Sequence, residues 1–171
     1  MTRLLVATLL SLYAACAMSQ DNATLYFYGP APSVDTVQKL AAGASTSVAR
    51  SGAMATVTVR WPDVSVEINI DPGWPREVQL SGIQGWLGGF PKEESGQPEV
   101  VAFMANLKKV TTAYGAVIAP QYDSSGKVFS LLRQLVAAGG GGFFFSHQSF
   151  YDMSGQRLIG TPGDPETLSP K

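Results

Sequence analysis

The sequence predicts a single domain of the α/β class (α+β type), a two-layer sandwich with a mixed or antiparallel sheet and helices on one face. Three observations predict it. The chain has 171 residues and is 45% hydrophobic, which suits one domain with its own core. Residues 56–70 alternate apolar and polar side chains, as a β-hairpin does, and strand and helix patterns succeed one another over residues 24–159. We therefore expect one folded unit over residues 20–160.

Residues 1–19 have the pattern of a signal peptide. Arg3 precedes an apolar run, small residues follow the run, and no acidic residue occurs before Asp21. Residues 15–17 fit cleavage after position 17, and cleavage after position 19 is the alternative. The apolar run is shorter than the roughly 20 residues that a membrane span needs. We therefore expect an exported protein, periplasmic or secreted, without a membrane span.

Two other interpretations of this segment stay open. Residues 13–16 resemble a lipoprotein signal in which Cys16 carries a lipid anchor, although Tyr13 stands where such signals have Leu, Val or Ile. The segment also fits an uncleaved apolar helix of the domain. Cleavage after position 17 would leave a mature chain without cysteine, because Cys16 is the single cysteine of the sequence.

The first strand and helix follow this segment. Residues 24–28 are β-branched or aromatic and end at Gly29 and Pro30, which predicts a strand. Ser33 then predicts the N-cap of a helix, because apolar residues recur after it at helical spacing. These apolar residues are Val34, Val37, Leu40, Ala41 and Ala44.

Residues 56–70 give the clearest local signal. The alternation is interrupted at Pro62 and Asp63, which predicts a hairpin with one buried and one solvent-facing side. A two-residue turn at this point would place Thr58 opposite Glu67 and Arg60 opposite Ser65.

Two helical segments follow the hairpin. Residues 75–90 have apolar residues at helical spacing but several glycines, so we expect a short helix held by packing. Residues 92–97 form a polar connection. Pro98 then suits the first position of a helix whose apolar stripe extends to Val110.

The last part of the chain predicts another strand, helix and strands. Residues 114–120 read as a central strand, and residues 126–138 as a helix that ends at Gly139. Residues 143–151 predict the last long strand, and residues 157–159 its short partner. The core stripe of the helix comprises Val128, Leu131, Leu132, Leu135 and Val136.

The two halves share an element order. Residues 24–70 and 114–159 each run strand, helix, strand, turn, strand, and Pro30 and Pro120 stand at corresponding places. In this order the chain resembles the duplicated folds of GyrI-like ligand-binding domains. The resemblance implies two βαββ halves with a small-molecule groove between them. We expect residues 161–171, which are rich in Pro and Gly, to be a flexible tail.

Composition excludes several classes of function. The chain carries 12 Lys and Arg against 13 Asp and Glu, so it lacks the basic excess with which proteins bind nucleic acid or anionic membranes. One His and one Cys are too few for a Cys/His zinc site. We therefore expect no metal, no cofactor and no nucleic-acid partner.

His147 is the single histidine and thus the one histidine base available for nucleophilic catalysis. If residues 143–151 form one strand, Ser146 points to the opposite face. Ser149 then shares the face of His147 but lies about 6.5 Å away along the strand. We expect His147 to have no catalytic role, and a hydrolase using His147 is the alternative.

Acidic residues and glycines give no better candidate. The turn aspartates stand near Pro, Gly or Ser, where Asp hydrogen-bonds its own backbone; they are Asp63, Asp71, Asp123 and Asp152. The glycines of residues 82–89 and 139–142 lack the Lys-Ser/Thr ending of a phosphate-binding loop. We therefore expect turns here rather than a carboxylate pair or a phosphate site.

Aromatic residues remain as candidates for binding. Trp61 is in phase with the apolar side of the hairpin and is expected in the core. Other aromatic residues stand in or beside loops. The expected ligand-binding residues, with the single histidine, are Trp74, Trp86, Tyr122, His147 and Tyr151. The sequence favours an exported, non-catalytic domain that binds a small ligand or a protein partner, with a periplasmic inhibitor or immunity-type protein as an alternative.

Overall fold

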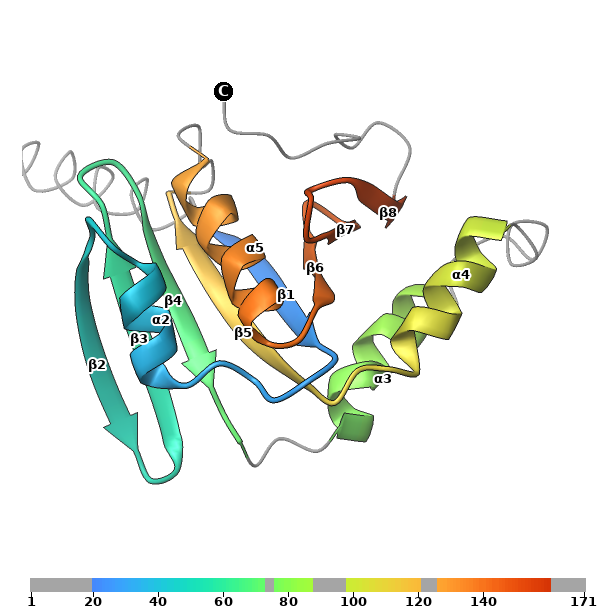
Figure 1. Cartoon of the computed structure of the whole chain (residues 1–171), viewed down its shortest axis with the longest axis horizontal. Helices are drawn as coiled ribbons and strands as arrows, with labels where there is room; N and C mark the ends of the chain where they lie inside the picture. The colour runs from blue at the N-terminus through green and yellow to red at the C-terminus, as the bar shows by residue number, and fades with distance from the viewer. Residues whose placement is uncertain (1–19, 73–75, 88–97, 121–125, 161–171) are drawn as a thin grey trace, which may run out of the picture.

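The computed structural model describes residues 20–72, 76–87, 98–120 and 126–160. An eight-stranded sheet forms its centre, with the order β2-β3-β4-β5-β1-β6-β7-β8 (Figure 1). Every neighbouring pair of strands is antiparallel. The α/β class is confirmed, and of the two expected sheet types the chain forms the antiparallel one.

The element bounds are as follows. The strands are β1 (Asp21–Phe27), β2 (Ser45–Ser51), β3 (Met54–Arg60), β4 (Ser65–Ile70), β5 (Thr112–Ala119), β6 (Gly142–Ser146), β7 (Ser149–Asp152) and β8 (Arg157–Gly160). The helices are α2 (Val34–Leu40), α3 (Arg76–Leu87), α4 (Pro98–Leu107) and α5 (Lys127–Ala138).

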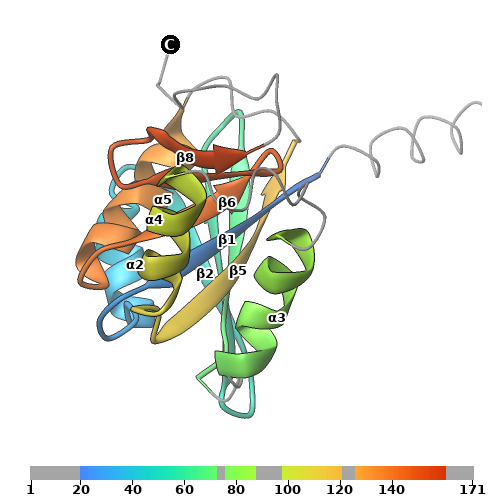
Figure 2. The ribbon, with the colours of Figure 1, turned by 90° about the vertical axis from the view of Figure 1, so that its right-hand side faces the viewer.

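Helices lie against both faces of the sheet. Leu25 of β1 belongs to the core beneath α2 and α5, whereas the next residue, Tyr26, belongs to a second core beneath α3 and α4. Figure 2 shows α2 and α5 on one side of the strands and α3 on the other. The two-layer arrangement with helices on one face is therefore not confirmed. The second face carries Phe143 and Phe150, which α3 and α4 shield from water.

The predicted register of the β3–β4 hairpin is confirmed. Thr58 pairs with Glu67 and Arg60 with Ser65. The backbone N–H of Trp61 donates to the carbonyl of Val64 at 2.8 Å, which closes the two-residue turn.

Helix ends also agree with the sequence. Ser33 caps α2, and its hydroxyl accepts a hydrogen bond from the backbone of Thr36 at 3.2 Å. Helix α4 begins at Pro98, and Gly139 is the C-cap of α5. All five residues of the predicted α5 stripe are buried.

Two strands differ from the prediction. The sequence predicts no strand at residues 45–51, because an edge strand exposed on both faces has no apolar alternation to reveal it. The strand expected at residues 143–151 is wrong as a single element. It is broken at His147 and Gln148, whose positive φ angles of 50° and 58° make the turn between β6 and β7.

Each half is therefore strand, helix and three strands instead of βαββ. The halves share this order but not its pairing. In the first half the last strand, β4, pairs with β5, whereas in the second half the first strand after the helix, β6, pairs with β1.

Candidate functional site

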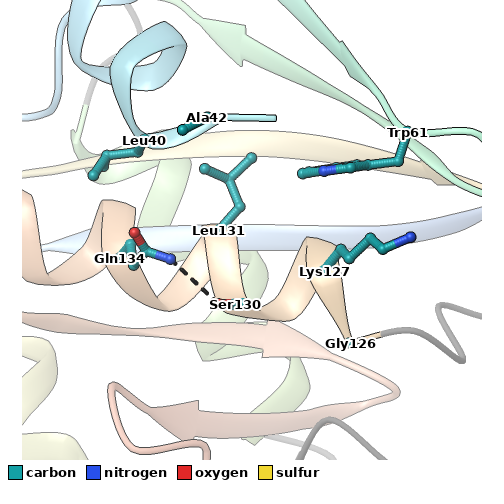
Figure 3. Close-up of a pocket in the computed structure, with 8 residues that line it drawn as sticks. All are labelled: Leu40, Ala42, Trp61, Gly126, Lys127, Ser130, Leu131 and Gln134. Carbon is teal, nitrogen blue, oxygen red and sulfur yellow. Dashed lines mark hydrogen bonds between the residues drawn. The ribbon is translucent and has the colours of Figure 1, made fainter. Parts of the chain in front are cut away.

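A pocket of about 330 Å³ opens on the face of the sheet covered by α2 and α5 (Figure 3). It lies between the helix of the first half and the helix of the second half. Its lining residues come from the end of α2, the end of β3 and the first turns of α5: Leu40, Ala42, Trp61, Gly126, Lys127, Ser130, Leu131 and Gln134.

The β3–β4 turn positions the indole of Trp61. Because Trp61 directly follows β3, the hydrogen bond to Val64 fixes its backbone at the end of the hairpin. The side chain is half-buried and packs against the edge of the core. In Figure 3 the flat ring extends toward Leu131, so one wall of the pocket is aromatic and aliphatic.

The polar part of the lining comes from α5, the helix that also carries Leu131. Gln134 donates from Nε2 to the hydroxyl of Ser130 at 3.2 Å, one helical turn away. Lys127 pairs with Asp63 of the β3–β4 turn, with Nζ at 2.8 Å from Oδ1. Both partners of this ion pair are partly exposed, so it contributes little to stability. It does fix the side chain of Lys127, which lines the pocket.

This combination of walls suits a small molecule with a flat apolar body. Binding sites for such molecules are concave and mostly apolar, with a few polar groups that set orientation. The volume lies at the lower end of the range of about 300–1,000 Å³ for such sites. Ser130 and Gln134 offer both donors and acceptors, so they can bind one polar group of the ligand.

A second cluster surrounds His147 at the β6–β7 turn. The hydroxyl of Ser146 lies 3.1 Å from Nδ1 of His147, and Nε2 lies 3.5 Å from Oδ2 of Asp21. The ring of His147 also lies against that of Phe129 on α5, with 5.6 Å between centroids. The cluster thus joins the start of β1, the β6–β7 turn and α5.

The expected orientation of Ser146 is wrong. Residues i and i+1 point to opposite faces only within a strand. His147 lies outside the strand, and its positive φ turns the imidazole back toward Ser146. Ser149, the other serine considered for catalysis, is the first residue of β7 and pairs with Ser146 across the turn.

A serine, an imidazole and a carboxylate in contact are the components of a catalytic triad. However, Ser146 and Ser149 both have no exposed surface. A substrate therefore cannot reach either hydroxyl in this arrangement. Oδ2 of Asp21 is buried without a hydrogen bond.

Of the five expected binding residues, the structure describes the side chains of His147 and Tyr151, and neither lines the pocket. His147 lies in the second cluster and does not line the pocket. Tyr151 is fully buried and stacked on Phe144, with 5.7 Å between centroids, so it serves the core and is not available to a ligand. Trp74 and Tyr122 lie outside the described residues. Trp86 lies in α3, and its side chain is outside the description.

None of the eight residues that line the pocket was among the expected binding residues, and Trp61 and Lys127 show why. Trp61 does continue the alternation of the buried valines of β3. However, it lies one residue beyond the end of the strand, so its ring is only half-buried. Lys127 could not be recognised, because its role depends on Asp63, which is distant along the chain.

Among the described residues, no group of three or more His, Cys, Asp or Glu side chains could hold a metal ion. No helix in these ranges is long and apolar enough to cross a membrane. No protein-family model, curated protein or solved structure matches the chain.

Proposed function

We propose that the protein binds a small, flat, mostly apolar molecule in the pocket between α2 and α5. One observation supports this proposal above the others. The indole of Trp61 lines a cavity of about 330 Å³ together with Leu131 and the polar side chains of Ser130 and Gln134 on α5. An aromatic ring that is half exposed beside such a cavity offers a stacking surface, which a tryptophan packed wholly in the core does not.

The charges at the pocket favour an uncharged polar group on the ligand. The ammonium of Lys127 is already paired with the carboxylate of Asp63 at 2.8 Å, so the two charges balance. A ligand carboxylate would approach Asp63 as well as Lys127, and like charges repel. An amide or hydroxyl group can instead bind to Ser130 and Gln134 without a net electrostatic cost.

A screen of small uncharged indoles, phenols and aromatic amides by two-dimensional ¹H–¹⁵N NMR tests the proposal. The indole N–H signal of Trp61, identified by its loss in the Trp61→Phe variant, should shift with the hits. Indole-3-acetamide should bind more tightly than indole-3-acetate, because only the second compound is charged. The proposal is overturned if no compound shifts this signal, or if the hits shift only signals outside the pocket.

Two glutamines provide a matched pair of variants. Gln134 lines the pocket, whereas Gln38 of α2 is exposed, donates to Thr46 and does not line it. Gln134→Ala should weaken binding of a hit about 5- to 10-fold, since it removes one hydrogen bond of about 1 kcal/mol. Gln38→Ala should leave binding unchanged. Equal weakening by both variants would contradict binding at this site.

The proposed setting is outside the cytoplasm, in the periplasm or the medium. The charge and hydropathy pattern of residues 1–19 supports this part of the proposal. Mass spectrometry of the protein recovered from its native host tests it. A chain that begins after position 17 or 19 is the expected result, and a chain with an intact Met1 would overturn it.

The contacts among Ser146, His147 and Asp21 support a second candidate, a serine hydrolase. It requires the β6–β7 turn to open, since Ser146 is buried. A fluorophosphonate probe distinguishes the two candidates. Labelling of the wild type but not of the Ser146→Ala variant would support hydrolysis, and an unlabelled wild type would exclude Ser146 as a nucleophile.

A further inference from the structure

We propose that β2 is a self-association edge, through which two copies of the protein pair antiparallel about a twofold axis at Val48. The first observation is the contrast between the two edges of the sheet. Strand β2 is seven residues long and pairs regularly with β3 over its whole length. Strand β8, at the other edge, has four residues and an irregular register with β7. Short and irregular edge strands resist pairing with another chain, whereas long regular ones permit it.

Strand β2 also has few of the residues that usually protect an edge. It contains no proline, and Arg50 is its single charged residue. Every residue of the strand except Thr46 is exposed. Among the described residues, β2 pairs with no strand on its outer side, as Figure 1 shows.

The hairpin between β2 and β3 determines which backbone groups face outward. Gly52 and Ala53 form a two-residue turn, so Ser51 and Met54 exchange both of their hydrogen bonds. Hydrogen-bonded and non-hydrogen-bonded pairs then alternate along the strand. The residues that direct their N–H and C=O groups to the outer edge are therefore Thr46, Val48 and Arg50.

One antiparallel register between two copies satisfies all three of these residues. If Val48 lies opposite Val48 of the second copy, Thr46 lies opposite Arg50 of the second copy. A register displaced in either direction leaves Thr46 or Arg50 without a strand residue opposite it. The centred register also avoids placing the two arginines opposite each other, which would be unfavourable.

The side chains suit this register as well. Val48 pairs with the buried Val57, so it points to the face that carries α2 and α5. It is 36% exposed in the single chain, and the twofold axis would bury it against its own copy. Ser47 lies opposite Ala49 of the second copy on the other face, and both are small enough for close approach. The centred register thus also pairs Ser45 with Ser51 of the second copy and places no two charged residues opposite each other.

An interface of one strand per chain is smaller than the roughly 1,200 Å² that stable complexes bury. The dimer should therefore be weak, with a dissociation constant on the order of 100 µM. We expect the molar mass in sedimentation equilibrium to rise from that of one chain toward that of two as concentration increases. A wild-type protein that keeps the mass of one chain at about 1 mM, roughly ten times this constant, overturns the proposal.

Opposite charges at the axis provide the specific test. Val48→Lys and Val48→Glu should each remain monomeric, because two like charges would meet at the axis. An equimolar mixture of the two variants should form a heterodimer, which native mass spectrometry identifies by its mass. Val78→Lys is the control, since Val78 is also an exposed valine but lies on α3. It should dimerise as the wild type does.

The mixture also excludes misfolding as the explanation. Two variants that fail to fold could not restore a specific heterodimer. Self-association that persists in Val48→Lys alone would show an interface elsewhere, and two folded variants that do not combine would show that the axis is not at Val48. Either result overturns the proposal.

Discussion

Raising the pH above 10 should destabilise the protein through Tyr26. This residue is 5% exposed in the core beneath α3 and α4, and its ring stacks on Phe143 with 4.9 Å between centroids. Burial raises the pKa of Tyr26 from 10.0 to about 12, because the phenolate loses its hydration, and a hydrogen bond with Thr24 opposes this rise. The neutral phenol is therefore favoured in the folded chain.

The direction and the size of the change in the free energy of unfolding follow from this difference in pKa. Between pH 10 and pH 12 the unfolded chain loses the proton of Tyr26 while the folded chain keeps it, so unfolding becomes more favourable as pH rises. The contribution of Tyr26 to the free energy of unfolding is fully present below pH 10 and is lost as the pH approaches 12. A shift of about two pKa units corresponds to about 3 kcal/mol in total, of which about 1 kcal/mol is lost by pH 11.

The assay is urea unfolding at pH 8 and pH 11, compared between the wild type and Tyr26→Phe. The variant keeps the aromatic ring but has no titrating group. Burial also raises the pKa of Tyr28 and Tyr114, so both proteins should lose stability at pH 11. The wild type should lose about 1 kcal/mol more than the variant. Equal losses would refute a raised pKa at Tyr26.

Three further predictions concern the fold. Gly142→Ala should lower the free energy of unfolding by several kcal/mol or prevent folding, because φ is 145° and an added Cβ would meet the carbonyl of Tyr26. Gly43 also has a positive φ but has open space around it, so Gly43→Ala should lower the free energy of unfolding in urea by only about 1 kcal/mol. Gln148→Gly should raise the melting temperature by relieving about 1 kcal/mol of strain at a φ of 58°. Phe103→Ala should cost about 3–5 kcal/mol in urea unfolding, since Phe103 is buried between α4 and the sheet; a cost below 1 kcal/mol would mean that α4 does not pack there.

Local patterns predicted the elements whose signals are contained in their own residues. The register of the β3–β4 hairpin follows from its alternation, and the buried stripe of α5 follows from its helical spacing. Strand β2 was missed because both of its faces are exposed, so neither face selects apolar residues. The break at His147 and Gln148 was missed because the turn lacks the Gly or Asn that usually marks positive φ angles.

The pocket depends on contacts that no local pattern records. Trp61 could be placed on the apolar side of the hairpin, but its position beside Lys127 depends on α5 packing next to α2. The placement of helices on both faces of the sheet likewise could not be predicted from local patterns. Phe143 and Phe144 point to opposite faces, which requires cover on both sides, yet a continuous aromatic run does not say which helices provide it. Those helices, α3 and α4, come from the middle of the sequence.

The central position of β1 has a consequence for the order of folding. Strand β1, the first of the described strands, pairs with β5 and β6, which begin at Thr112 and Gly142. During synthesis, residues 21–27 therefore have no strand to pair with until most of the chain has been made. Contacts between segments so distant along the chain slow folding. Until residues 112–119 and 142–146 have been made, β1 cannot take its place at the centre of the sheet, so the sheet is expected to form only after most of the chain has been synthesised.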